Sequence, residues 1–524
     1  MYHAPVSARP RQADGRRLLV VAAMLFALAL LAFDAQAFLA AALRAIRYPF
    51  ELDYGEGIVW QQAQQMGSGH AYGSITGFPT IVFHYPPLYH AITLAVAGAS
   101  GLDMLMAGRI VSVAATLLTA AFAALIAYRA VRGDIARKAA GLCGLIAGLV
   151  TLTVWPVTNW GPLMRVDMVA MALGLAGLWL SMLAFTRPRL IHLAALCFVA
   201  AVFAKQTAIA APAAAFLTLL LLKPRTALSG IATSIALGLA VLGLLSWATD
   251  GGFVRHIFLY NINRFDASRL AAIATVLARH EGYLAVVGIG LAKLHSTRQA
   301  PFSLRELRGH LAESQGAACL LLLLLYLAFA VLMMLTVAKV GSNINYFLEA
   351  LCAIAILVGV ACRDAAVAVT EGSAFEERGA VLLRIGLPLL IGVQALLVPP
   401  PLAAEVKPSR MAETWQLVQM IHDADGPVIS DDMVLIKRAD REVVWEPAIF
   451  AELASKGIWD ERPFIARVRR AEFAFFVTRG DRGGVLFESR YTPAVADAMD
   501  AAYPVRRRMA GYVLHLPRDM AAPR

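Results

Sequence analysis

Two carboxylates close together are the first residues in this chain that could do chemistry. Asp53 and Glu56 lie three residues apart within residues 51–57, so one helical turn or a glycine-assisted loop would place both at one site. A carboxylate there can accept a proton from an attacking hydroxyl, or hold a divalent cation against a phosphate. The alternative is that both side chains cap the next helix and are simply solvated.

Cations at the ends of apolar stretches form a second set. Arg165 and Asp167 precede one apolar stretch, and Lys205 and Gln206 interrupt another. Charged groups at membrane depth either pair with one another or mark a ligand path. As ligand-binding groups, Lys205 supplies a point charge and Arg165 a bidentate fork, which suits the phosphate of a lipid head group. Structural pairing of Arg165, Asp167 and Lys205 is the alternative.

Three further polar segments lie near apolar stretches. His84 and Tyr85 precede two prolines, and an aromatic belt at the membrane interface would by itself explain Tyr85. Arg264 belongs to a polar segment, residues 255–269. The third segment opens an apolar stretch and is more polar than a lipid-facing helix accepts. Its candidate residues are Asn343, Asn345, Tyr346 and Glu349.

Membrane-spanning helices must position these residues. The 524 residues are 59% hydrophobic and only 16% charged, with a mean hydropathy of +0.65, which is more apolar surface than one soluble core can hide. A span needs ~20 apolar residues. By that measure we expect about eleven spans, near residues 18–42, 107–130, 138–158, 163–185, 189–206, 207–223, 227–248, 270–292, 315–337, 343–362 and 380–399.

The distribution of basic residues predicts the orientation of these spans. The net charge of +11 is concentrated in short clusters between apolar stretches, such as Arg16 with Arg17 and Arg129 with Arg132. By the positive-inside rule, residues 1–17 and these clusters are cytoplasmic, and an odd number of spans then places the C-terminus on the opposite face. We therefore attribute the excess of basic residues to the orientation of the spans in the membrane, and we expect no nucleic-acid partner.

Two regions on the outer face are long enough to contribute a site. Residues 43–106 form a large first loop between spans of the transmembrane module, residues 18–399, and contain helical patterns at Gly57–Gly67 and Leu88–Ser100. We expect the second of these to lie along the membrane surface. Residues 400–524 predict a small α/β domain. Its helical patterns are Ala412–Asp423, Pro447–Lys456 and Thr492–Ala502, and its strand-like runs are Val428–Ser430, Phe473–Thr478 and Gly511–Leu516.

Five motifs in this order resemble those of the GT-C superfamily of integral-membrane glycosyltransferases. The resemblance is to bacterial relatives of protein O-mannosyltransferases and of the lipid A aminoarabinose transferase, and it extends over residues 15–400. The motifs are Asp53–Gly57, Tyr85–Tyr89, Arg165–Asp167, Lys205–Thr207 and Gly341–Glu349. The better-known members have an adjacent Asp-Glu pair in the first motif, whereas Gly55 precedes Glu56 in this chain.

The resemblance implies a mainly helical GT-C-like fold and an enzyme of the bacterial inner membrane. Such an enzyme takes a sugar from a polyprenyl-phosphate carrier and passes it to a hydroxyl of a glycan, lipid or protein acceptor on the periplasmic face. Either Asp53 or Glu56 is then the catalytic base. We expect Lys205, Arg165 and Arg264 to bind the donor phosphate, with the other candidates nearby. The sequence identifies no cofactor, and a divalent cation is a possible one.

Two other classes of function compete with this interpretation. A transporter or flippase of a lipid-linked sugar is expected to show repeated halves with helices broken near mid-membrane, and the sequence shows no matching halves. A receptor or scaffold anchored by its spans needs no charged residues at membrane depth. The sequence therefore favours the transferase over both alternatives.

Overall fold

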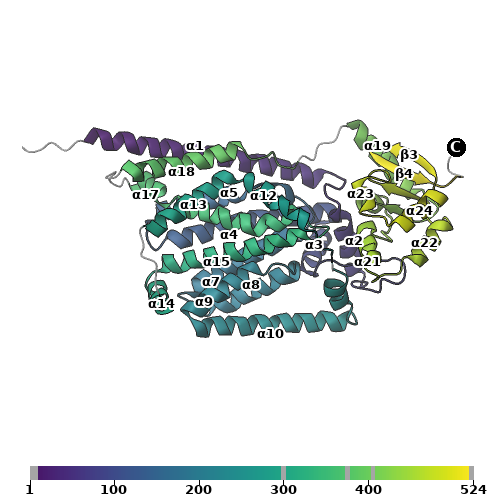
Figure 1. Ribbon diagram of the computed structural model, residues 1–524, viewed down its shortest axis with the longest axis horizontal. Coiled ribbons are helices and arrows are strands. Elements are labelled where there is room, and N and C mark those ends of the chain that lie inside the picture. The colour runs from purple at the N-terminus through teal and green to yellow at the C-terminus, as the bar shows by residue number, and fades with distance from the viewer. Residues whose placement is uncertain (1–9, 262, 297–302, 372–377, 403–407, 519–524) are drawn as a thin grey trace, which may run out of the picture.

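The computed structural model describes residues 10–261, 263–296, 303–371, 378–402 and 408–518. Residues 1–9 of the predicted cytoplasmic N-terminus lie outside these ranges. A body of long helices carries a small four-stranded sheet at one end (Figure 1). This arrangement agrees with the fold class expected from the sequence, a mainly helical body followed by a small α/β region.

Most helices of the body run along its long axis, and shorter ones connect them (Figure 1). The first half comprises α1 (Pro10–Arg47), α2 (Gly55–Gly67), α3 (Leu88–Ser100), α4 (Met104–Val131), α5 (Arg137–Thr151), α6 (Trp155–Trp160), α7 (Asp167–Ala184), α8 (Leu190–Ala204), α9 (Ala210–Leu222) and α10 (Pro224–Ala248). The second half comprises α11 (Gly252–Val254), α12 (Ala271–Ala278), α13 (Glu281–Ser296), α14 (Leu304–Glu313), α15 (Gln315–Met334), α16 (Leu348–Ala361), α17 (Arg363–Glu371) and α18 (Arg378–Leu396).

Each predicted span falls on helix, but the lengths of the helices vary. In the described part of the chain, six helices are long and apolar enough to cross a bilayer alone. The span predicted near residues 270–292 consists of two helices, because α12 and α13 meet at an angle of 76°. Polar groups stabilise this break: the backbone N–H of Trp155 donates to Nε2 of His280 at 3.1 Å, and Gly282 donates to Gln394 at 2.7 Å.

Apolar side chains cover the outer surface of the helical body. On α10, Leu239 and Trp247 are 61% and 81% exposed, and on α1, Leu18 and Phe33 are also exposed. These two helices run along opposite edges of the body, with α18 packed beside α1 (Figure 1). Apolar surface of this extent is unfavourable in water and favourable in lipid.

The C-terminal sheet has the strand order β1-β2-β4-β3, in which β1 and β2 are parallel and the other pairs antiparallel. The predicted helices and strands of this region are confirmed with small shifts. β3 was not predicted, because its edge residues Arg506, Arg507 and Arg508 are exposed and show no apolar alternation. The strands are β1 (Val428–Ser430), β2 (Phe475–Thr478), β3 (Val505–Met509) and β4 (Tyr512–Leu516), and the helices α19 (Pro408–His422), α20 (Met433–Arg438), α21 (Pro447–Ser455), α22 (Arg462–Arg469), α23 (Val485–Glu488) and α24 (Pro493–Ala502).

The C-terminal region packs directly on the first loop. Helix α20 lies against α2 so closely that a Cβ atom on Gly57 would be 2.6 Å from Cβ of Met433. The backbone N–H of Thr80 donates to the carbonyl of Val444 at 2.8 Å, which joins the loop to the chain before α21. The first loop is therefore held between the helical body and the C-terminal sheet.

The loops predicted to be cytoplasmic gather at the other end of the body. Arg17 donates to the carbonyl of Val369 at 3.2 Å, and Arg363 pairs with Asp134 at 3.1 Å. These contacts place the start of α1, the α4–α5 turn and the α16–α17 turn at one end, opposite the first loop. Three of the segments predicted to be cytoplasmic therefore lie together at this end of the body.

Candidate functional site

A cavity of about 140 Å³ opens between the first loop and the ends of several helices. Seven of the residues singled out in the sequence line it, although they come from five separate segments. They are Asp53, Tyr85, Arg165, Lys205, Asn343, Asn345 and Tyr346, together with Tyr54, Gly55, Trp160 and Gly341.

Asp53 presents its carboxylate to this cavity from a tight turn before α2. Its Oδ2 accepts hydrogen bonds from the backbone N–H of Gly55 and from Nη1 of Arg165, both at 3.1 Å. An aspartate that binds the N–H two residues ahead forms a local Asx turn, which fixes the loop. Burial raises the pKa of Asp53 above its ordinary value of 3.8, against the opposing effects of Arg165 and Gly55. The second oxygen, Oδ1, has no donor among the described residues, and Asp53 lines the cavity.

Arg165 stands in the turn between α6 and α7 and contacts both carboxylate and aromatic groups. Its Nη2 donates to the hydroxyl of Tyr85 at 3.0 Å, and its guanidinium lies 5.1 Å from the ring centroid of Trp160. Its Nε is buried with no hydrogen-bond partner in the described part of the chain. Arg165 therefore has a planar, oriented donor group at the cavity, which suits a bidentate anion.

Lys205 ends α8 and pairs with a buried carboxylate. Its Nζ donates to Oδ1 of Asp167 at 2.6 Å, and it lies 5.0 Å from the ring centroid of Tyr346. Asp167 also accepts from Asn345 at 2.8 Å and from Nε1 of Trp160 at 2.7 Å. The pairing expected as the structural alternative is thus present. Lys205 nevertheless stays 12% exposed, and an ammonium has three donors, so it can still meet a ligand in the cavity.

Glu56 points away from the cavity into the protein. Both of its oxygens accept from Arg109 on α4, at 2.8 and 2.7 Å, and the backbone N–H groups of Leu52 and Met164 complete its bonding. The side chains of Glu56 and Arg109 are 0% exposed, whereas those of Asp53 and Arg165 keep 18% and 12%. Burial raises the pKa of Glu56, but Arg109 and the two N–H groups outweigh it and lower the pKa below 4.5.

Gly55 explains why this chain has no adjacent acidic pair. A Cβ atom at this position would be 1.3 Å from Nη1 of Arg165, so no side chain fits unless Arg165 moves. The carboxylate that bonds Arg165 instead comes from Asp53, two residues earlier. The roles of the two acidic residues therefore separate, with Asp53 at the cavity and Glu56 within the packed interior.

The remaining predicted residues lie around the cavity or outside it. His84 contacts Glu446 of the C-terminal region at 3.0 Å, and Gln206 donates to the carbonyl of His84 at 2.9 Å. Glu349 lines a small neighbouring cavity of about 30 Å³ that shares Lys205, Asn345 and Tyr346 with the first. Arg264 is exposed and is not part of either cavity.

Residues of the C-terminal region contact the chain both before and after Asp53. Glu51 pairs with Arg479 at 2.7 Å. The ring of Tyr54 lies under Arg490, with Cζ 4.3 Å from the ring centroid, and its hydroxyl accepts from the N–H of Ala448 at 3.3 Å. The segment that carries Asp53 is therefore held in place by residues of the C-terminal region, which lie more than 370 positions later in the chain.

A divalent cation finds few ligands at this cavity. Among the residues that the structure describes, no three His, Cys, Asp or Glu side chains come together as a metal-binding group. Glu56 and Asp167 are saturated by their own partners, which leaves Oδ1 of Asp53. Mg²⁺ bound through one carboxylate takes its other ligands from water and substrate phosphates, so a divalent cation stays open at this cavity.

Sequence reasoning missed Arg109, Arg479 and Arg490. Arg109 could have been identified from the sequence, because it is a charged residue inside a predicted span, residues 107–130. Its guanidinium also donates to the carbonyls of Ala45, Tyr48 and Phe50. Arg479 and Arg490 carried no signal, since arginines are frequent in the exposed parts of any soluble domain.

Comparison with known proteins extends the description of the fold. No protein-family model and no curated protein matches the chain. A crystal structure of ArnT from Cupriavidus metallidurans bound to undecaprenyl phosphate superposes with a TM-score of 0.57 at 16% identity, covering 93% of this chain and 98% of that one. The apo structure of the same protein gives 0.56 at 14% identity over the same shares. The chain therefore has the fold of these ArnT structures, which confirms the GT-C-like fold class expected from its sequence.

Proposed function

We propose that this protein is a membrane-embedded glycosyltransferase that uses a polyprenyl-phosphate sugar as donor. The observation that carries the proposal is the convergence of Asp53, Arg165 and Lys205 on one cavity at the end of the helical body. A carboxylate beside two cations supplies both a base and a phosphate site. A protein of the same fold has been crystallised with undecaprenyl phosphate, which supports a lipid-linked donor for this chain.

In the proposed reaction the acceptor hydroxyl attacks the anomeric carbon of the donor sugar. The new bond joins the acceptor oxygen to that carbon, and the bond between the carbon and the phosphate oxygen breaks. The electron pair of the broken bond stays on the polyprenyl phosphate, whose charge Arg165 and Lys205 stabilise. The hydroxyl proton passes to the carboxylate of Asp53, which acts as general base.

Asp53 is a better candidate for the base than Glu56. A general base must be within hydrogen-bond reach of the proton that it removes, and Asp53 lines the cavity whereas Glu56 does not. The raised pKa of Asp53 also makes it a stronger base than an ordinary aspartate. Glu56, enclosed by Arg109 and two backbone N–H groups, has no room for a substrate hydroxyl.

The acceptor class and the membrane side belong to the same proposal. We place the cavity and the C-terminal region on the periplasmic face of a bacterial inner membrane, because the basic loops gather at the opposite end. A glycan, a lipid or a protein can supply the acceptor hydroxyl. A reporter that is active only in the cytoplasm, fused after Leu516, is expected to be silent; a strong signal would reverse the proposed orientation.

Membranes from expressing cells, supplied with labelled polyprenyl-phosphate sugar, test the proposed activity. Label should move from the carrier into an acceptor fraction in a time-dependent manner, and Asp53→Asn should prevent this. A transporter is the competing function, and it would move the lipid-linked sugar between vesicle leaflets and leave the sugar–phosphate bond intact. Intact carrier in every fraction, with the parent protein folded and present, would contradict the transferase.

A further inference from the structure

The small cavity beside the proposed donor cavity is lined by a carboxylate that the proposed reaction does not use. Glu349 supplies this carboxylate from the first turn of α16, within the span predicted at residues 343–362. The small cavity shares Lys205, Asn345 and Tyr346 with the donor cavity. A ligand bound at Lys205 therefore lies next to both spaces.

Glu349 has no hydrogen-bond or ion-pair partner in the described part of the chain. Lys205 is the one cation among the described residues that line the small cavity, and it donates to Asp167 at 2.6 Å instead. An unpaired carboxylate in a membrane-spanning helix is costly, and such residues usually mark a ligand path. Structural pairing, which accounts for Asp167, therefore does not account for Glu349.

The size of the small cavity limits what can enter it. A cavity needs roughly 10–15 Å³ to hold one water molecule, so a volume of about 30 Å³ takes about two non-hydrogen atoms. A pyranose ring is too large for this space and must stay in the donor cavity of about 140 Å³. Only a short substituent of the ring can extend past Lys205 to Glu349.

The lining of the small cavity combines the carboxylate of Glu349 with apolar side chains. These include Ala170 and Met171 of α7, Ala208 before α9 and Met333 of α15. A hydroxymethyl group has the same division, because its methylene is apolar and its hydroxyl donates a hydrogen bond. A carboxylate accepts such bonds, and a hydrogen bond to an ionised acceptor is among the stronger ones.

We propose that Glu349 makes the enzyme specific for a hexose donor by binding the exocyclic hydroxymethyl group of the sugar. This inference rests on the proposed function, because it takes the donor phosphate to lie at Arg165 and Lys205. The hydroxymethyl group extends one carbon atom beyond the ring of a hexopyranose, and a pentopyranose lacks it. A pentose therefore leaves the carboxylate without its donor, and a site built to bond a substrate hydroxyl rejects the analogue without it.

Carriers that differ only in this group test the proposal. Labelled undecaprenyl phosphate is displaced from the full-length protein in detergent by undecaprenyl-phosphate sugars in three matched pairs. The pairs are D-glucose with D-xylose, D-mannose with D-lyxose, and D-galactose with L-arabinose. In at least one pair the hexose should bind roughly 10- to 100-fold more tightly than the pentose, the usual effect of a hydrogen bond to a charged group. In no pair should the pentose bind more tightly.

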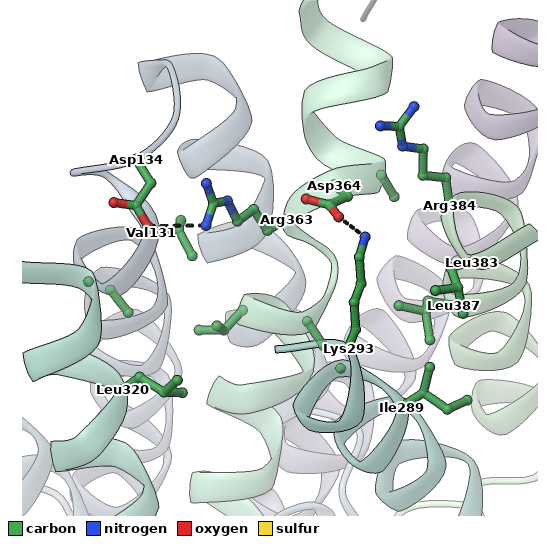
Figure 2. Close-up of a pocket in the computed structure, with 16 residues that line it drawn as sticks. Val131, Asp134, Ile289, Lys293, Leu320, Arg363, Asp364, Leu383, Arg384 and Leu387 are labelled. Atoms are coloured by element: carbon green, nitrogen blue, oxygen red, sulfur yellow. Dashed lines mark hydrogen bonds and ion pairs between the residues drawn. The ribbon is translucent and has the colours of Figure 1, made fainter. Parts of the chain in front are cut away.

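Glu349→Ala should bind both members of each pair equally and bind undecaprenyl phosphate itself as the parent does. It should unfold at the parental temperature or above, because the substitution breaks no ion pair. The matched control is Asp364→Ala, which removes a carboxylate from a cavity at the other end of the body, where Asp364 pairs with Lys293 (Figure 2). This control should keep the hexose preference of the parent.

A second variant fills the small cavity without changing its charge. Ala208→Val adds two methyl groups to the wall, so it should lower the affinity for the hexose carrier and leave that for the pentose carrier unchanged. A parental hexose preference in this variant would contradict the proposed place of the hydroxymethyl group.

Three further results would overturn the proposal. Equal affinities within all three pairs would leave the small cavity to water. A hexose preference that persists in Glu349→Ala would assign the selection to another residue, and weaker binding of undecaprenyl phosphate by that variant would make Glu349 part of the phosphate site. The proposed function is tested separately, by loss of sugar transfer in Asp53→Asn, and it fails together with this inference only if the parent binds none of the carriers.

Discussion

Arg109 on α4 bonds both carboxylate oxygens of Glu56 on α2, with N···O distances of 2.8 and 2.7 Å, although neither side chain has any exposed surface. The same guanidinium donates to three backbone carbonyls between residues 45 and 50. One buried arginine thus joins the end of α1, the start of α2 and the body of α4. The pair fixes the loop in which Asp53 lies.

Glu56→Gln or Arg109→Gln should destabilise the protein by about 3–5 kcal/mol, because each leaves a buried charge without its partner. Since the folded pKa of Glu56 lies below its ordinary value of 4.5, the stability from this pair is present at neutral pH and is lost as the pH falls through the folded pKa. Thermal unfolding in detergent measures both effects. A Glu56→Gln variant with parental stability and no transfer would instead make Glu56 the base.

Asp53→Asn should abolish detectable sugar transfer while the protein stays folded and still binds the carrier. Loss of a general base typically costs ~10²–10⁴-fold in rate, and the amide keeps the shape and the bond from Gly55. The matched control is Asp103→Asn, the same change in the N-cap of α4, where asparagine caps equally well. It lies outside the cavity and should transfer sugar at the parental rate.

The rate of transfer should also depend on pH in a defined direction. The base acts only when it is ionised, and burial raises the pKa of Asp53 above 3.8. The rate should therefore fall on acidification through a pKa higher than that of an exposed aspartate, and any residual activity of Asp53→Asn should lack this acidic limb. An acidic limb that persists in the variant would assign the base to another group.

Lys205→Gln and Arg165→Gln should each weaken binding of polyprenyl phosphate by about 10- to 100-fold, the usual value of a charge-assisted hydrogen bond. Glutamine retains a donor for Asp167 or Tyr85, so the neighbouring groups stay bonded. Arg264→Gln is the matched control, because Arg264 is exposed and outside the cavity. Binding of the labelled carrier in detergent measures the difference. Parental binding by both cavity variants would make these residues structural pairs.

The sequence predicted which segments meet at the cavity more reliably than which atoms do. Asp53, Arg165, Lys205 and Asn345 are unusual because they are polar or charged beside apolar stretches, and that signal is local. Arg264 carries the same signal, yet it faces solvent. Charge beside a span shows that a residue is near the membrane surface; it does not show toward which neighbour the side chain points.

The sequence could not predict, for a related reason, that Asp53 lines the cavity while Glu56 is enclosed in the interior. The two residues are three positions apart, but their partners are Arg165, in the turn before α7, and Arg109, on α4. Only the packing of α2 against α4 decides which carboxylate is enclosed. Likewise, helices and strands of the C-terminal region follow from local pattern, whereas their contact with the first loop depends on pairs more than 360 residues apart, such as Thr80 with Val444 and Glu51 with Arg479.

Arg490 should act as a positioning residue for Asp53. Its guanidinium lies over the ring of Tyr54 at 4.3 Å and pairs with Asp431 at 2.8 Å, so it ties the residue next to Asp53 to the sheet. A shift of ~1 Å in a reacting group can cost 10²-fold in rate. Arg490→Ala should thus lower kcat by about 10- to 100-fold and leave KM for the donor nearly unchanged, because Arg165 and Lys205 are not touched.

Three measurements separate this role from a loss of folding. Arg490→Lys keeps a cation over Tyr54 and should recover part of kcat, whereas a purely hydrophobic contact would not be rescued by lysine. The matched control Arg508→Ala removes an exposed arginine of β3, paired with Asp481 in the same region, and should have no effect on kcat. Thermal unfolding shows whether each variant is folded. If Arg490→Ala is folded and transfers sugar at the parental kcat, the C-terminal region does not position Asp53, because the contact with Tyr54 is then dispensable for the reaction.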